Sequence, residues 1–242
     1  MAPKLEDSSV FLVAVGTFEP NAAMPLKLGA AGAIRHDEAA AAEFSTLVPG
    51  QAVEYKLTWC TVSVTANRFL IQTTTPPHIK AADLMQKMVS ELMPKAAVSQ
   101  LGINRQFKIK FSSPEERDEF GVRIAPPGTW GSWGKKIQER ISSSSKEPHG
   151  GLVNMTMREM PVPGRVSGWR DVQIAASLAN SYDAAILLND HYERVDIGDV
   201  PPGLEDSEIA ARTTSSFLKV LREQFEDSLN TLDEIAQSIV QG

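Results

Sequence analysis

The stretch Val53–Thr75, VEYKLTWCTVSVTANRFLIQTTT, contains two apolar runs separated by Ala66-Asn67-Arg68, and a helical pattern follows over Lys80–Met93. The stretch Arg170–Tyr192, RDVQIAASLANSYDAAILLNDHY, repeats this order, and a longer helical pattern follows over Ser207–Val240. Runs rich in β-branched and aromatic residues and bounded by turn residues are typical of paired strands. Two strand-strand-helix units predict an α+β fold, in which helices cover one face of a mainly antiparallel sheet.

The alternation within the first stretch changes sides near its middle. Val53, Tyr55 and Trp59 occupy one face of the expected strand, but beyond Trp59 the apolar side moves to Val62 and Val64. One inserted residue inverts the two faces of a strand. We therefore expect one strand with a β-bulge near Trp59.

Three further segments carry local signals. Ile103–Phe111 alternates between a mostly apolar face and a polar face, which predicts a strand. Ser113–Glu116 has the form of a capping box with proline at the first helical position, and it predicts a short helix that ends at Gly121. The alanines after Asp37 favour a helix over Glu38–Leu47.

The middle of the chain is rich in proline, glycine and serine, and it divides the two repeated units. We expect a first α+β unit over residues 1–124, a connecting segment over 125–168 and a second strand-strand-helix unit over 169–242. A single continuous domain is the alternative, because 242 residues fit either arrangement.

Composition is typical of a globular protein, with 42% hydrophobic and 22% charged residues. The net charge of -6 argues against nucleic acid as a partner, since phosphates attract basic surfaces. The alternative is a local basic face that carries Lys108 and Lys110. The first residues lack the basic and apolar regions of a signal peptide, and no apolar run is long enough for a membrane span. We therefore expect a cytoplasmic protein that does not enter a membrane.

The residue types that hold metals and cofactors are sparse. Cys60 is the only cysteine, and the four histidines are scattered along the chain. No glycine-rich loop has the spacing that nucleotide binding requires. The sequence predicts no bound metal and no cofactor.

A tryptophan-containing loop is the first candidate for a ligand site. Trp130 and Trp133 lie in a glycine-rich stretch, and Lys135 and Lys136 follow them. Two indole rings on a loop can stack on a sugar, a base or a partner's side chain, and the lysines can hold an anion nearby. The alternative is that both rings fill the gap between the two repeated units.

The sequence Asn189-Asp190-His191-Tyr192-Glu193 is the second candidate. An imidazole beside carboxylates can act as a general base, so Asp190, His191 and Glu193 are the catalytic candidates. On a continuing strand, His191 and Glu193 point to one face, and Asp190 points to the other. The alternative is a solvated polar strand end.

The last helical pattern is the third candidate. Its apolar residues follow a heptad spacing, with Ser228 in one apolar position. Thr213–Ser216 has poor helix propensity and predicts a break or a bend. An apolar stripe this long rarely stays exposed, so we expect it to pack on its own sheet or to form an interface with a partner. The stripe consists of Leu218, Leu221, Phe225, Leu232, Ile235 and Ile239.

These features favour a non-enzymatic binding or assembly module that acts as an oligomer or as a subunit of a larger complex. Its expected partner is a protein or a second copy of the chain. The alternative is a small-molecule enzyme, such as a hydrolase, that uses the His/carboxylate cluster between the two units.

Overall fold

The computed structural model describes residues 3–142, 151–176, 183–199 and 201–242. Within them, nine strands form one sheet in the order β2-β3-β4-β5-β1-β6-β9-β8-β7, and neighbouring strands are antiparallel. The strands are β1 Lys4–Thr17, β2 Glu43–Val48, β3 Ala52–Lys56, β4 Thr61–Thr65, β5 Arg68–Thr73, β6 Ala97–Lys110, β7 Asn154–Glu159, β8 Ser167–Ala176 and β9 Asp183–Arg194.

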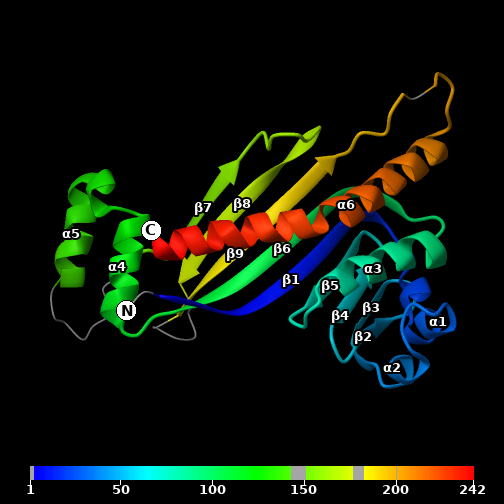
Figure 1. Ribbon diagram of the computed structural model, residues 1–242, viewed down its shortest axis with the longest axis horizontal. Helices are drawn as coiled ribbons and strands as arrows, with labels where there is room; N and C mark the ends of the chain where they lie inside the picture. Colours follow the sequence, from blue (N-terminus) through cyan, green and yellow to red (C-terminus); the bar gives the residue numbers. More distant parts are fainter. Residues whose placement is uncertain (1–2, 143–150, 177–182, 200) are drawn as a thin grey trace.

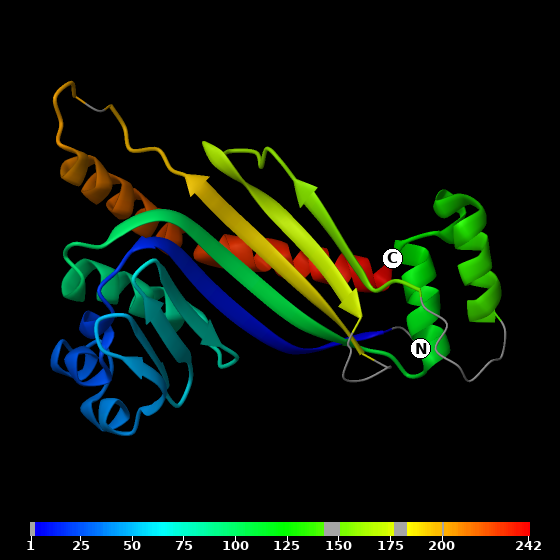
Figure 2. The ribbon, with the colours of Figure 1, turned by 180° about the vertical axis from the view of Figure 1, so that it is seen from behind.

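The helices that form the main core pack against one face of this sheet. Figure 1 shows α3 and the long α6 in front of the strands, and Figure 2 shows the strands from the other side. The prediction of an α+β fold with a mainly antiparallel sheet and a long C-terminal helix is confirmed. The helical elements are η1 Pro20–Ala23, α1 Pro25–Ala30, α2 His36–Ala40, α3 Ile79–Lys87, η2 Met88–Leu92, α4 Pro114–Ile124, η3 Pro127–Trp130, α5 Gly131–Ser142 and α6 Asp206–Gln241.

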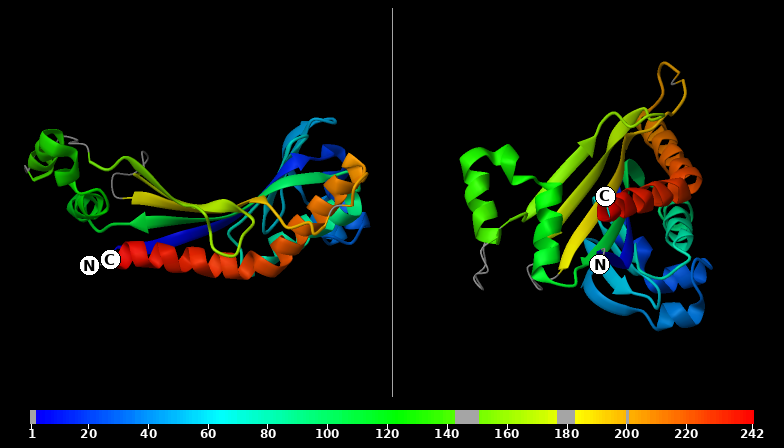
Figure 3. Two further views of the ribbon diagram at one scale, coloured as in Figure 1. Left: turned by 90° about the horizontal axis from the view of Figure 1, so that it is seen from above. Right: turned by 60° about the vertical axis from the view of Figure 1, so that its left-hand side comes forward.

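Helix α6 is continuous over 36 residues, about 54 Å at 1.5 Å per residue. Of the predicted break or bend at Thr213–Ser216, the break does not occur. The hydroxyls of Thr213 and Thr214 donate to carbonyls one turn earlier in the same helix, a contact that often bends helices. Figure 3 shows that the N-terminal part of α6 bends away from the line of the rest. The helix therefore covers the sheet along its length and joins two clusters of core residues.

The first core cluster lies against β1, β3, β4, β5 and the first half of β6, and the second lies against the second half of β6 and against β8 and β9. Phe225 of α6 belongs to the first cluster, and Leu232 belongs to the second. Strand β1 pairs with β5 on one side and β6 on the other, so the two expected units share one uninterrupted sheet.

The first repeated unit has three strands where two were expected. Lys56 pairs with Thr61 across a tight hairpin, in which the Leu57 amide donates to the Cys60 carbonyl over 2.8 Å. The expected β-bulge near Trp59 was therefore wrong, and a chain reversal produces the change of apolar face. The second unit has the predicted order, β8 then β9 then α6; its expected turn over Asn180–Asp183 lies mostly outside the described residues.

One other local prediction needs correction, and two more elements can be compared with their expected bounds. The expected helix over Glu38–Leu47 is the short α2 followed by strand β2, which pairs with β3 at one edge of the sheet. The expected connecting segment over 125–168 contains η3, α5 and strand β7, so it is structured in its described parts. The capping signal was right, since the Ser113 side chain accepts from the Glu116 amide, but α4 continues three residues beyond Gly121.

Candidate binding site

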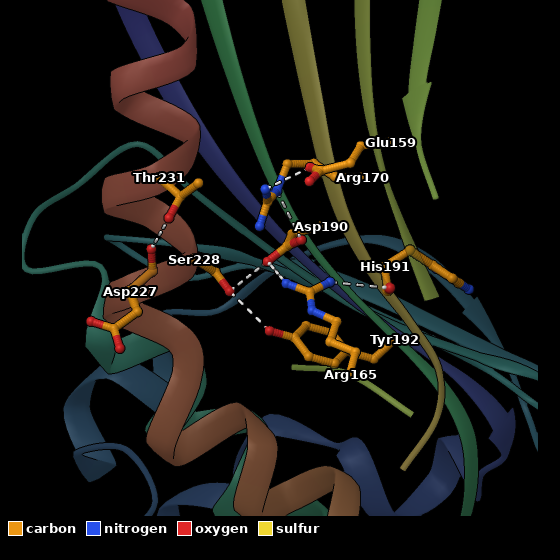
Figure 4. A network of polar contacts seen from close by, with 9 residues as sticks. All are labelled: Glu159, Arg165, Arg170, Asp190, His191, Tyr192, Asp227, Ser228 and Thr231. Carbon is orange, nitrogen blue, oxygen red and sulfur yellow. Dashed lines mark hydrogen bonds and ion pairs between the residues drawn. The ribbon is translucent and has the colours of Figure 1, made fainter. Parts of the chain in front are cut away.

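A buried ion network lies between α6 and the last strands. The alternation of β9 directs Ile186, Leu188 and Asp190 toward α6, and Asp190 is fully buried. Arg165 donates from Nη2 to Asp190 Oδ2 over 2.6 Å, and Arg170 donates from Nε to Oδ1 over 3.3 Å (Figure 4). A buried carboxylate requires such partners, because moving an ionised carboxylate out of water without a partner costs several kcal/mol.

Two hydroxyl groups complete the network. Ser228 donates from Oγ to Asp190 Oδ2 over 2.7 Å, so its single proton is committed and the Tyr192 hydroxyl must donate to Ser228 over 3.2 Å. Burial, followed by the Asp190 charge, raises the pKa of Tyr192. Ser228 therefore occupies an apolar position of the α6 stripe because it hydrogen-bonds a buried carboxylate.

A polar hollow of about 520 Å³ opens beside this network, and we call it the arginine pocket. Arg165 and Arg170 lie at its buried side, the segment Val162–Val166 forms one wall, and α6 forms another. Arg170 also donates to Glu159 over 2.8 Å, while Arg165 packs its guanidinium 4.0 Å from the centre of the Tyr192 ring.

An apolar hollow of about 450 Å³ lies next to it, between α4, α6 and the strands β7 and β8. We call it the methionine groove. Its charged lining residues are Arg123, Arg158, Glu159 and Arg170, and its apolar ones are Ile124, Met155, Met157, Val172, Ile174, Ile235 and Ile239.

A third hollow, of about 300 Å³, lies between α4, α5 and the ends of β7, β8 and β9, and we call it the tryptophan pocket. Trp130 and Trp133 line it, and they are 58% and 62% exposed. Their ring centres are 6.0 Å apart at an interplanar angle of 65°. The alternative in which both rings fill a gap between the two units is therefore wrong. Lys135 and Lys136 follow on α5 and are exposed.

The three catalytic candidates do not come together. Asp190 lies on the α6 face of the sheet, whereas His191 lies on the opposite face and stacks on Trp169 with ring centres 4.0 Å apart. Glu193 shares the His191 face and accepts from Ser167 over 2.7 Å. Burial lowers the pKa of His191, so its ring is neutral near pH 7. The sheet thus separates this imidazole from the buried carboxylate.

The α6 stripe packs mainly on its own sheet. Leu221, Phe225 and Leu232 are at most 1% exposed, so they are not available to a partner. Ile235 and Ile239 are partly buried and line the methionine groove. Leu218 is partly buried beside the first core cluster. Of the two expected outcomes for the stripe, the structure shows packing on the chain's own sheet for its three most buried residues.

The basic face proposed for Lys108 and Lys110 is largely neutralised. Lys108 lies 2.9 Å from the Asp183 carboxylate, and Lys110 lies 3.5 Å from that of Glu6. A groove for a phosphate backbone needs cations that are free to release their counterions. These two ion pairs reduce that capacity.

We expect Cys60 to be chemically inert in the folded protein. It is 5% exposed, and burial, followed by the Glu38 charge, raises the pKa of its thiol to about 12. Because the thiolate is the reactive form, iodoacetamide near neutral pH should leave the folded chain unmodified and should alkylate it once after unfolding. Intact mass spectrometry measures both outcomes, and rapid alkylation of the folded chain would contradict this burial.

Sequence reasoning missed Arg165, Arg170 and Ser228 as members of a site. Arg165 lies in the proline- and glycine-rich segment, which gave no positional information. A usable signal existed for Arg170, since it shares the strand face of Val172 and Ile174, as Asp190 shares that of Leu188. Two opposite charges at the end of apolar faces on neighbouring strands indicate a buried pair.

Within the described residues, no group of three His, Cys, Asp or Glu side chains is arranged to hold a metal ion. Among the described helices, none combines the length and apolar character that crossing a membrane requires. Comparison of the sequence with protein-family models and with curated proteins gives no match.

Proposed function

We propose that this chain is a non-enzymatic binding module whose ligand places an apolar group in the tryptophan pocket. The observation that carries the proposal is the exposure of Trp130 and Trp133 at an open, mostly apolar hollow. Large aromatic side chains are usually buried, and exposed ones that border a pocket are typical of binding sites.

The local packing supports the same function. Helix α5 makes its contacts chiefly with the preceding turn η3, so its apolar side chains are not consumed by the main core. Ile137 and Ile141 of α5 face the hollow together with Leu152. Binding an apolar group here removes these surfaces from water, which contributes about 25 cal/mol per Å² of apolar area.

The other two functions expected from the sequence have weaker support. An enzyme that uses Asp190 with His191 requires the two groups on one face, and the sheet separates them. Self-association through the α6 stripe requires Phe225 at a surface, and it lies in the core. Assembly through another surface stays part of the proposal, because a binding module can hold an apolar segment of a partner protein in the same pocket.

A fluorescent, uncharged apolar probe tests this function. We expect N-phenyl-1-naphthylamine to bind saturably, with increased emission and energy transfer from tryptophan. Trp130→Ala and Trp133→Ala should each weaken its affinity on the order of tenfold, since central aromatic contacts dominate such sites. Both variants should keep the wild-type urea midpoint, because the rings are exposed.

Trp169→Phe is the matched control. Trp169 lies on the opposite face of the sheet, stacked on His191, so its replacement should leave the probe affinity unchanged. Absence of saturable binding to the wild-type protein would contradict the proposed function. Equal losses in all three variants would place the probe elsewhere.

A further inference from the structure

The three hollows follow one another along the α6-facing side of β8. Arg170 lines both the arginine pocket and the methionine groove. Val172 lines the groove, and Ile174 lines both the groove and the tryptophan pocket. Ala176 lines the tryptophan pocket. These four residues alternate along one strand, so their side chains lie on the same face and mark a continuous furrow.

The furrow has a defined length and a change of character along it. Six strand residues at about 3.4 Å each separate Arg170 from Ala176, which gives roughly 20 Å. Neighbouring β7 adds Met157 opposite Val172 and Met155 opposite Ile174. The furrow is therefore polar at Arg170 and apolar from Val172 onward, a profile that matches an extended chain with one polar end.

The arginine pocket is lined by four basic and four acidic side chains, so the sign of the head group depends on the rim of the methionine groove. The charged residues that line the methionine groove are three arginines and Glu159. The Arg158 guanidinium pairs with Asp171 and stacks on Trp169 on the opposite face of the sheet. Arg123 and Arg170 are therefore the cations of the furrow. Arg123 donates to backbone carbonyls at the end of α6 and has no carboxylate partner within the described residues. Two arginines against one carboxylate, Glu159, at the rim of an apolar groove favour an anionic head group.

Arg170 is placed to receive this head group. Its Nε donates to Asp190 and its Nη1 donates to Glu159, and among the described residues its Nη2 has no hydrogen-bond partner. The guanidinium thus keeps two N–H groups at the junction of the arginine pocket and the methionine groove. The polar pocket beside it gives room for a carboxylate or a phosphate.

We propose that the furrow binds an anionic amphiphile with a single long alkyl chain, such as a fatty acid or a lysophospholipid. The head group binds at Arg170, and the chain runs over Val172 and Ile174 toward the tryptophan pocket. This inference rests on the proposed function, because the end of the chain occupies the same apolar pocket.

Calorimetry with dodecanoate tests the inference on the full chain. We expect dodecanoate to bind, and decanoate to bind on the order of tenfold more weakly, because two methylene groups leave the furrow. Dodecyltrimethylammonium, with the same chain and a cationic head, should bind more weakly than dodecanoate. Dodecyl phosphate distinguishes the two head groups. Binding as tight as that of dodecanoate would mean that the site accepts either anion, and weaker binding would mean that it prefers a carboxylate.

Variants at the head-group position separate this inference from the proposed function. Arg170→Gln should weaken dodecanoate binding about tenfold and leave the affinity for uncharged N-phenyl-1-naphthylamine unchanged. Because Arg170 also contacts buried Asp190, Glu159→Gln serves as a second variant that leaves this contact in place. It removes the competing carboxylate, so dodecanoate should bind severalfold more tightly. Arg35→Gln, at an exposed residue of the distant α2 region, is the control.

Each contrary outcome points to a different failure. Saturable binding of the uncharged probe without binding of dodecanoate would overturn this inference and leave the proposed function standing. Equal affinity for the cationic and anionic amphiphiles would overturn the assignment of the head group. Displacement of the probe by an apolar peptide but not by dodecanoate would assign the furrow to a protein segment. Failure of every probe to bind would contradict both proposals.

Discussion

Replacing Asp190 with alanine is expected to lower the free energy of unfolding by about 3–5 kcal/mol. Asp190 is fully buried, and its carboxylate accepts from Arg165, Arg170 and Ser228. Arg170 retains Glu159 as a partner in the variant. Arg165 keeps its packing on the Tyr192 ring, but within the described residues its remaining hydrogen bond is a long one to the His191 carbonyl. The loss therefore comes mainly from the largely buried Arg165 guanidinium that is left without a carboxylate.

Urea denaturation followed by far-ultraviolet circular dichroism measures this loss. Asp227→Ala is the matched control, because Asp227 lines the same pocket from α6 and is exposed. We expect the control to change stability by no more than about 0.5 kcal/mol. Asp190→Asn keeps the size of the side chain and serves if the alanine variant does not fold. Equal midpoints for the Asp190 and Asp227 variants would show that the buried network is absent in solution.

A double variant identifies the origin of the loss. Adding Arg165→Met to Asp190→Ala removes the orphaned charge and keeps much of the side-chain volume, so it should recover part of the lost stability. If Arg165→Met instead adds its own full cost, the two residues are independent. The rescue thus distinguishes the pairing of Arg165 with Asp190 from the general packing of either residue.

Most of the sheet was predictable, because the alternation of apolar and polar residues along a strand indicates which side chains are buried. In β6, the apolar positions Ile103, Phe107 and Ile109 all face the core, as their spacing indicates. The long α6 was predictable for the same reason, since one stripe of its residues is apolar. Its poor helix formers at Thr213–Ser216 did not interrupt it, because tertiary packing outweighs propensity.

The errors in the predicted secondary structure arose where the local sequence lacks a turn-forming residue or an alternation of apolar residues. The hairpin over Leu57–Cys60 contains neither glycine nor proline nor asparagine, so its reversal was interpreted as a β-bulge. Strand β2 has six exposed residues at the edge of the sheet, and an exposed strand has no apolar alternation to reveal it. Its formation depends on pairing with β3, which is a property of the whole sheet.

The site was predictable only in its isolated parts. The tryptophans stood out because two of them share a short glycine-rich stretch, and they proved to be exposed. The network around Asp190 joins β8, β9, α6 and the segment before β8, and its hydrogen-bonded pairs are up to 38 residues apart in sequence. No local sequence pattern predicts a contact between residues so far apart. The furrow that passes Arg170 depends on these contacts, because they position the Arg170 side chain.

The α6 stripe gives the second large effect. Phe225→Ala should lower the free energy of unfolding by about 3–5 kcal/mol, because a fully buried ring leaves a cavity in the first core cluster. The mass in solution should stay unchanged, since Phe225 does not reach a surface. Urea denaturation and light scattering measure the two quantities on the same samples.

The combination of stability and mass decides between a core and an interface. Glu226→Ala, on the exposed side of the same turn, is the control and should alter neither quantity. Phe225→Leu, which leaves a smaller cavity, keeps the comparison possible if the alanine variant unfolds. A fall in mass with unchanged stability would mean that Phe225 contacts a second copy, and the packing of α6 on its own sheet would then be wrong. A loss of stability at constant mass would leave Ile235 and Ile239 as the part of the stripe that faces open space, and that space is the methionine groove.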